Sequence, residues 1–226
     1  SGAFRASQFA YEENPKAHYQ TTGPEIWKDT NGKVDVLVAG AGTGGTISGT
    51  GSYLKEQNPN LKVVLADPEG SILSGDHPRT YLVEGIGEDF IPYNFDRQIV
   101  DDFVRVSDSE SFAMAKKLAR EEGLLVGASS GTAVVAAMKY AERLKENSVV
   151  VAILPDTGRN YITKLFNEEW LTSHGLVSND EPRVTALEVV RAKQRPGIVS
   201  VPSSSSIAEA VAVMHKHNIS QLPVMH

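Results

Sequence analysis

The sequence contains no cysteine. Within these 226 residues, this absence excludes disulfide bonds, a thiolate nucleophile, cysteine-ligated zinc and iron–sulfur clusters. It agrees with a reducing compartment, and the first residues lack the basic-then-apolar pattern of a secretion signal, so we expect a cytoplasmic protein. Long apolar runs are also missing, since none exceeds six residues. A membrane-spanning helix needs about 20, so we expect no membrane partner.

Basic residues are outnumbered by acidic ones. The chain has 22 Lys and Arg against 28 Asp and Glu, for a net charge of −6 and a pI near 5.5. Nucleic-acid-binding surfaces are usually basic, so no nucleic-acid partner is expected. The histidines lack metal-ligand spacing, because His215 and His217 lie two apart on an expected helix and face different directions. We therefore expect no metal site.

Strands and helices are expected to alternate along most of the chain. The apolar run 34–39 is typical of a parallel strand buried on both faces, and helix 47–56 and strand 61–66 complete a right-handed βαβ unit. Residues 71–103 are expected to be mainly loop. The remaining expected elements are helix 107–122 with a capping box from Ser107 to Glu110, strand 124–126, helix 132–145, strand 149–154 and helix 161–170. This order predicts an α/β fold with an open, mostly parallel twisted sheet flanked by helices.

A glycine-rich loop follows the first expected strand. Residues 40–45 match G-x-G-x-x-G between a strand and a helix, where backbone amides and the positive helix end can hold a phosphate. The hydroxyls of Thr43 and Thr46 favour one terminal phosphate over a pyrophosphate. Asp67, at the end of the next strand, keeps open an NAD-binding Rossmann domain, because a ribose-binding acid belongs there.

Two more small-residue loops follow expected strands, at residues 127–131 and 155–160. A hydroxyl of the first, Ser129 or Ser130, could meet a ring nitrogen or a carboxylate, although a helix N-cap is the simpler interpretation of that loop taken alone. The carboxyl ends of parallel strands are where open α/β sheets bind ligands. Three such loops on one sheet edge therefore predict a ligand site.

Six blocks in order resemble the cysteine synthase and cystathionine β-synthase family of fold-type II pyridoxal-phosphate enzymes, which have a tryptophan synthase β-like fold. The blocks are Asn14–Tyr19 with Thr22–Ile26, then Gly42–Thr46, Asp67–Ser71, Glu84–Gly87, Gly123–Gly131 and Leu154–Asp156. The resemblance covers residues 8 to about 176. The blocks at Asp67–Ser71 and Glu84–Gly87, together with the tail, favour the cystathionine β-synthase branch.

The resemblance implies roles for matching residues. A first set would cradle the phosphate of pyridoxal 5'-phosphate: Gly42, Thr43, Gly44, Gly45 and Thr46. Ser129 would bind the pyridine nitrogen. Gly85 and Gly87 would lie on a mobile loop beside the substrate. The implied reaction is a β-replacement of the lyase type, in transsulfuration and cysteine biosynthesis, that joins serine or an activated serine to homocysteine.

The resemblance also implies a domain organisation. Residues 1–176 would be the C-terminal part of the catalytic core, 177–195 a linker, and 196–226 the incomplete start of a Bateman-type (CBS domain) regulatory module. S-adenosylmethionine would regulate only an intact parent protein. From the same resemblance we expect a homodimer or a higher homo-oligomer.

None of the lysines lies in the family's lysine context, so the Schiff-base lysine is expected upstream of Ser1. We therefore assign no catalytic residue to this chain and expect it to be inactive alone. A haem-binding segment would also lie upstream, which leaves haem open. The alternatives are a cysteine synthase that uses sulfide, the NAD-binding domain, and a non-catalytic regulatory chain.

Overall fold

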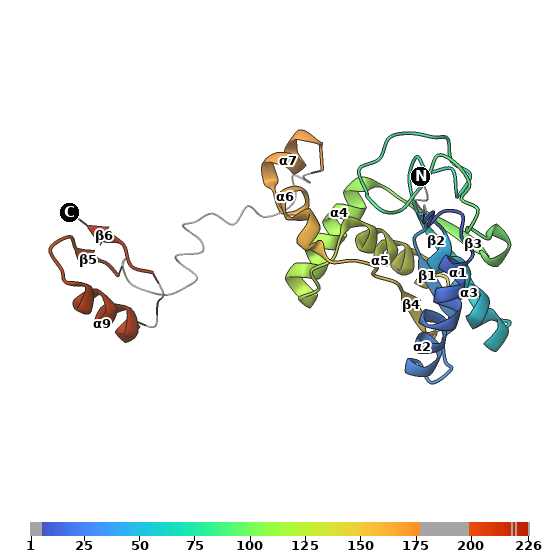
Figure 1. Ribbon diagram of the computed structural model, residues 1–226, viewed down its shortest axis with the longest axis horizontal. Coiled ribbons are helices and arrows are strands. Elements are labelled where there is room, and N and C mark those ends of the chain that lie inside the picture. Colours follow the sequence, from blue (N-terminus) through green and yellow to red (C-terminus); the bar gives the residue numbers. More distant parts are fainter. Residues whose placement is uncertain (1–5, 177–198, 218, 220, 226) are drawn as a thin grey trace, which may run out of the picture. The chain divides into compact units, whose positions relative to one another are not determined.

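The computed structural model describes residues 6–176, 199–217, 219 and 221–225. The chain divides into two compact units, Ser1–Asn179 and Asp180–His226 (Figure 1). Each unit has its own sheet and helices, and each is described by itself below.

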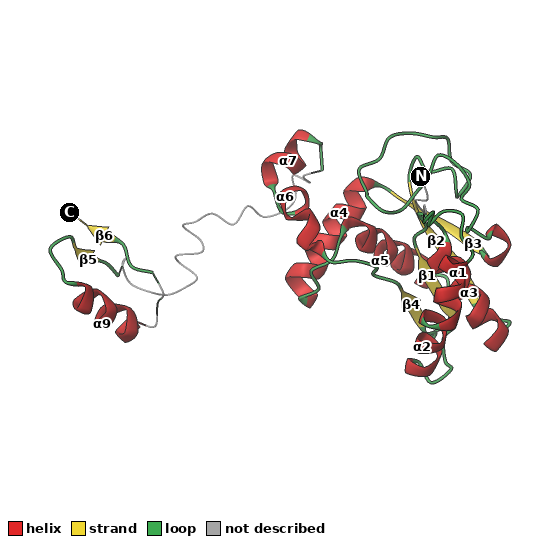
Figure 2. Ribbon diagram, in the orientation of Figure 1, coloured by secondary structure: helices red, strands yellow, loops and turns green. Residues whose placement is uncertain are grey.

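The first unit contains a four-stranded parallel sheet (Figure 2). Its strands are β1 (Val36–Ala39), β2 (Lys62–Pro68), β3 (Asp102–Val106) and β4 (Val150–Ala152), in the order β3-β2-β1-β4. Helix α3 (Gly45–Gln57) connects β1 to the neighbouring parallel strand β2, which completes the predicted βαβ unit. The predicted α/β fold with a mostly parallel sheet is confirmed.

Two strand predictions need correction. Residues 102–103 fall in the segment predicted as loop, yet β3 forms there because it pairs in parallel with β2, from Val64 opposite Asp102 to Pro68 opposite Val106. Conversely, residues 124–126 form no strand. Leu124 and Leu125 are exposed rather than paired with another strand. Pairing partners, which a local pattern does not contain, decide both cases.

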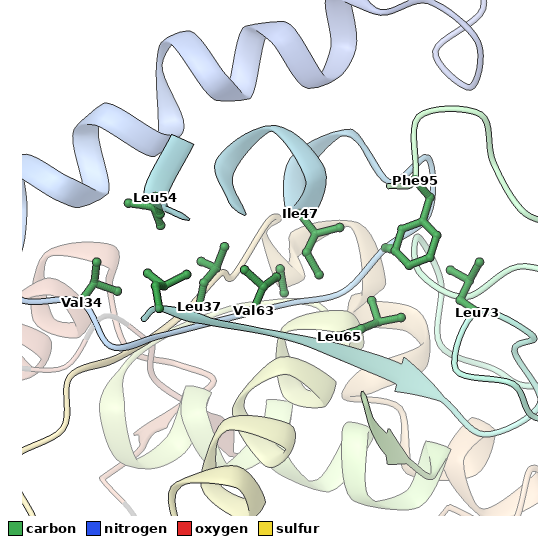
Figure 3. Packing of buried hydrophobic residues seen from close by; sticks show 11 residues of the cluster. Val34, Leu37, Ile47, Leu54, Val63, Leu65, Leu73 and Phe95 are labelled. Carbon is green, nitrogen blue, oxygen red and sulfur yellow. The ribbon is translucent and has the colours of Figure 1, made fainter. Parts of the chain in front are cut away.

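Side chains of the central strands alternate between two apolar layers. Leu37, Val63 and Leu65 point to one face of the sheet, where Figure 3 shows Ile47 and Leu54 of α3 pointing toward them. The same layer includes Leu73 and Phe95 from the long segment between β2 and β3. Helices α1 (Glu13–Gln20) and α2 (Thr22–Asp29) pack outside α3. This layer fixes the start of α3 against the end of β1.

The opposite face packs against α5 (Ala128–Ala141), with α4 (Asp108–Lys117) beside it. Val36, Val38 and Val64 point to this face, where Ala133 and Ala136 meet them. Because both faces are covered, β1 and the segment 63–66 of β2 are apolar, as the sequence predicts.

Helix boundaries follow local capping chemistry. The Ser107–Glu110 capping box begins α4, as predicted. The segment Leu118–Glu122 continues α4 as η2 and ends at Gly123, with a φ of 69°. Helix α5 begins four residues before the expected position. The single helix expected over 161–170 is instead three short pieces around Asn167, which caps the last one; they are η3 (Gly158–Tyr161), α6 (Ile162–Leu165) and α7 (Glu168–Ser173). A short helix, η1 (Arg97–Ile99), precedes β3.

The second unit contains β5 (Val201–Pro202), α9 (Ile207–His217) and β6 (Val224–Met225). Its strands pair in parallel, and a capping box joins Ser206 and Glu209 at the start of α9, as the sequence predicts. Apolar residues of α9 stay exposed, Ile207 by 85%. A helix expected over 184–193 lies outside the described residues.

The described part of the chain lacks two features, a membrane-spanning helix and a cluster of metal ligands. None of its helices combines the length and apolar character needed to cross a membrane. No three His, Asp or Glu side chains in this part gather closely enough to hold a metal ion.

Candidate functional site

A cleft of about 210 Å³ opens at the carboxyl ends of β1 and β4. Strand β1 lies between β2 and β4, so the chain leaves β1 in one direction for β2 and returns on its other side as β4. Ligands bind at such a switch point in open α/β sheets. The lining residues come from all three predicted loops and two further segments: Gln8, Ala39–Thr43, Gly44, Thr46, Gly85, Ile86, Ser129, Ile153 and Pro155.

The loop after β1 accepts only glycine at several positions. Gly44 has a φ of 84°, and a Cβ on it would lie 2.5 Å from the Cα of Phe95. A Cβ on Gly42 would lie 2.6 Å from the carbonyl oxygen of Gly85. Gly45 begins α3, whose N-terminus carries free amides and a partial positive charge. The loop is therefore a close backbone cradle suited to a phosphate.

Thr43 has a hydroxyl proton that is free to meet a ligand. Asn14 Nδ2 donates to Thr43 Oγ1 at 2.9 Å, and the Gly45 amide approaches the same oxygen at 3.4 Å. Because Oγ1 is the acceptor in both contacts, its own O–H remains available to donate. Thr43 lines the cleft.

Thr46 belongs to a chain of hydrogen bonds through His18. Thr46 Oγ1 lies 3.2 Å from His18 Nε2, and His18 Nδ1 lies 2.9 Å from Thr22 Oγ1. Burial lowers the pKa of His18, which favours the neutral ring. If Thr22 donates to Nδ1, then Nε2–H donates to Thr46, and the Thr46 hydroxyl can donate into the cleft.

Asn14 and His18 were given no separate role from the sequence. They are four residues apart on α1, so both reach the same face of that helix and touch the two threonines. The i, i+4 spacing of two polar side chains is the signal that could have identified them.

Ser129 lies in the first turn of α5 and lines the cleft. Its side chain makes no hydrogen bond with the described residues although it is only 4% exposed. The N-cap of α5 is Gly127, without a side-chain cap, so the N-cap interpretation of Ser129 and Ser130 is wrong. Ser130 Oγ is buried, has no hydrogen-bond partner in the described part of the chain and does not line the cleft. Of the two serines, Ser129 is placed to meet a ligand.

Asp156 ties the third loop to the start of α5. Its Oδ1 accepts a hydrogen bond from the Gly127 amide at 3.1 Å, and its Oδ2 accepts one from the Tyr161 hydroxyl at 2.7 Å. The bond to Asp156 raises the pKa of Tyr161 to about 12. This bridge holds the turn that carries Ser129.

A loop from the long segment before β3 closes over the glycine loop. Gly85 and Gly87 have φ values of 84° and 80°, and the Gly87 amide donates to the Ala41 carbonyl at 2.8 Å. Gly85 lines the cleft, whereas Gly87 packs against Pro68 and Tyr81. The structure thus brings this segment to the glycine loop.

Asp67 cannot serve as a ribose ligand. Its side chain is fully buried, Oδ2 accepts from the Ser74 amide at 2.9 Å, and Oδ1 has no partner among the described residues. Burial raises the pKa of its carboxyl. The NAD hypothesis rests on Asp67, and the side chain of this residue points into the protein interior rather than toward a ligand.

A family model described as "Pyridoxal-phosphate dependent enzyme" matches residues 1–156. The chain belongs to this family. Its cofactor, pyridoxal 5'-phosphate, has one phosphate monoester and a pyridine ring. The cradle of close glycine amides, the hydroxyls of two threonines, and a serine hydroxyl that has no hydrogen-bond partner among the described residues form a donor set that fits both groups.

Named relatives come from several organisms. The chain is 50% identical over 175 residues to a cystathionine beta-synthase of Apis mellifera, covering 75% of this chain and 35% of the relative. It is 46% identical over 157 residues to a cysteine synthase of Helicobacter pylori, covering 70% of this chain and 51% of the relative. The chain thus spans between about a third and a half of these relatives.

A solved structure supports the fold. The crystal structure of the O-acetylserine dependent cystathionine beta-synthase from Helicobacter pylori matches with a TM-score of 0.67 and 46% identity. The match covers 70% of this chain and 51% of that one. This family membership and fold agree with the resemblance carried by the six sequence blocks.

Proposed function

We propose that the protein carries out pyridoxal-phosphate-dependent β-replacement on serine or an activated serine, with homocysteine as the second substrate. The bond between the β-carbon and its oxygen substituent would break, and a bond to the sulfur of homocysteine would form. The departing group would take up the thiol proton, so the products are cystathionine and water from serine, or cystathionine and the released acid from an activated serine. The observation that carries this proposal is the cleft at the β1–β4 switch point, where three loops present donors for a phosphate and a pyridine nitrogen. The relatives' names supply the reaction class.

The phosphate would be held by Gly42–Thr46. Amides of the glycine loop and the start of α3 would donate to its oxygens, and Thr43 and Thr46 would add their hydroxyls. Asn14 would keep the Thr43 proton directed away from the protein, because it donates to the threonine oxygen; His18 would do the same for Thr46 in the tautomer that carries its proton on Nε2. Anchoring the phosphate would also position the pyridine ring to which it is attached.

Ser129 would hydrogen-bond the pyridine nitrogen. A neutral hydroxyl, unlike a carboxylate, leaves that nitrogen without a fixed proton. When bound, the cofactor would supply electron withdrawal from the substrate's α-carbon. A moderate electron sink suits loss of a β-substituent. The loop with Gly85 and Gly87 would border the substrate and exclude water.

Sulfide is the alternative second substrate, because one relative is named cysteine synthase. The two reactions share the cofactor and the first substrate and differ only in the incoming sulfur nucleophile. They are separated by offering the intact holoenzyme serine or O-acetylserine with homocysteine or with sulfide, and by quantifying cystathionine and cysteine. Formation of neither product would overturn the proposal.

We further propose that the chain contains parts of two domains. Residues 1–176 would form the C-terminal part of the catalytic core, and 196–226 the start of a regulatory module of the Bateman type. The small parallel pair β5–β6 and the exposed apolar side of α9 support the second assignment. A homo-oligomer and regulation by S-adenosylmethionine remain predictions for the intact protein.

A further inference from the structure

Glu88 places an unpaired carboxylate beside the glycine loop. Its Oε1 lies 3.8 Å from the position that a Cβ on Gly42 would take, and Gly42 lines the cleft. The side chain is half-buried, and the part of the chain that the structure describes offers it no hydrogen bond or ion pair. Its two oxygens are therefore available to accept hydrogen bonds from a positively charged group.

The backbone on both sides holds Glu88 in place. Its amide donates to Ser71 Oγ at 3.1 Å, and its carbonyl accepts from the Ile72 amide at 2.9 Å. The preceding residue, Gly87, donates to the Ala41 carbonyl at 2.8 Å. These three bonds join the loop to the segments that follow β1 and β2, so the Glu88 side chain extends from a fixed backbone.

The charges around Glu88 do not neutralise it. Burial, together with the neighbouring Asp89, raises the pKa of the Glu88 carboxyl. In the described part of the chain, Lys164 pairs with Glu84, and Arg79 and Arg105 both reach Asp76. None of these three cations forms an ion pair with Glu88.

We propose that Glu88 binds the α-ammonium group of the second amino-acid substrate and so selects an amino-acid thiol over sulfide. This inference rests on the proposed β-replacement. When bound, the cofactor would hold the first substrate through that substrate's amino group, so the ammonium that stays free belongs to the second substrate. Sulfide carries no cation and gains nothing from this carboxylate.

The test uses the intact holoenzyme and the variant Glu88→Gln, which removes the charge and keeps the shape. With saturating first substrate, we expect the KM for homocysteine to rise about 10- to 100-fold, the range for a lost charged hydrogen bond. The KM for sulfide and for serine should change less than about twofold. Glu69→Gln, at an exposed carboxylate just after β2, is the matched control and should leave all three values unchanged.

A second probe separates charge from shape. The thiol 4-mercaptobutyrate equals homocysteine without its ammonium, and its competition with homocysteine should be as strong or stronger in Glu88→Gln than in the unmodified enzyme. Cofactor content, measured by absorbance, should stay the same. An unchanged KM for homocysteine, an equal loss with sulfide, or loss of cofactor would each overturn the role of Glu88. Failure of the unmodified enzyme with both nucleophiles would instead overturn the proposed β-replacement.

Discussion

Gly44 and Gly85 share the same unusual backbone angle but not the same surroundings. Both have a φ of 84°, which L side chains adopt only at a cost of about 1–2 kcal/mol. A Cβ on Gly44 would overlap the backbone of Phe95, whereas a Cβ on Gly85 would find nothing within 4 Å. Substitutions at these two glycines therefore distinguish the cost of backbone strain, which both share, from the cost of steric overlap, which only Gly44 has.

We predict that Gly44→Ala lowers the free energy of unfolding of the first unit more than Gly85→Ala does, by about 1–3 kcal/mol, the usual cost of overpacking. Gly44→Ala should also weaken retention of pyridoxal phosphate, because Phe95 or the loop must move. Urea denaturation and equilibrium dialysis measure the two effects. Equal losses in both variants would mean that backbone strain alone decides, and that the close packing of Gly44 is unimportant.

His18 is a titratable side chain that contacts Thr46 of the glycine loop. Its pKa is lowered from 6.5 by burial, so the unfolded chain binds the proton before the folded protein does. Stability contributed by neutral His18 is therefore present above pH 6.5 and is lost as the pH falls toward the lowered pKa.

We predict that His18→Gln removes this part of the pH dependence of unfolding. The loss of stability between neutral pH and the lowered pKa should become shallower in the variant, as followed by denaturant unfolding at a series of pH values. His77→Gln, at an exposed position, is the control and should keep the original slope. A His18→Gln profile parallel to that of the unmodified protein would contradict the buried neutral ring.

At the scale of elements, the start of α5 depends on a loop from another strand. Asp156 follows β4 and accepts hydrogen bonds from Gly127 and Tyr161, which lie before α5 and within η3. A Cβ on Gly127 would lie 2.5 Å from Asp156 Oδ1, so the two loops already touch. Ser129 therefore takes its position from two loops rather than one.

We predict that Asp156→Ala weakens cofactor affinity about tenfold, because the Gly127 amide and the Tyr161 hydroxyl lose their acceptor and the turn before Ser129 relaxes. Asp156→Asn keeps one carbonyl acceptor, so its cofactor affinity should lie between that of Asp156→Ala and that of the unmodified protein. Cofactor fluorescence measures both the affinity and the environment of the pyridine ring. Full affinity and an unchanged emission in Asp156→Ala would show that the bridge does not position Ser129.

At the scale of the whole molecule, the first unit is held by two apolar layers that share one sheet. Leu37 is fully buried under α3, while Met138 on α5 is 55% exposed. The second unit buries one apolar side chain, Val201, among its described residues. Most of the hydrophobic stabilisation therefore belongs to the first unit.

We predict that Leu37→Ala lowers the unfolding free energy of the first unit by about 2–5 kcal/mol, the range for a large cavity in a core. Met138→Ala should cost less than about 0.5 kcal/mol, because solvent already reaches that side chain. Urea denaturation followed by tryptophan fluorescence reports on this unit, which contains both tryptophans, Trp27 and Trp170. Similar losses in the two variants would contradict the assigned core.

Local chemistry in the sequence determined the features that depend on neighbouring residues alone. Both capping boxes begin helices, because a serine and a glutamate three residues apart satisfy each other's backbone. The apolar runs before Gly40 and Asp67 form buried strands, and the βαβ order follows from their spacing. The glycine loop could be located for the same reason, since its glycines and threonines lie between a strand and a helix.

Tertiary structure decided what depends on partners distant in the chain. Strand β3 forms where β2 pairs with it, whereas residues 124–126 pair with none of the described strands and form no strand themselves. Asn14 and His18 reach the threonines of the glycine loop only because α1 packs on α3. Asp67, which has the sequence position of a ribose ligand, is buried instead. Hydrogen bonds and burial between distant segments are set by packing, and a local sequence pattern does not contain that information.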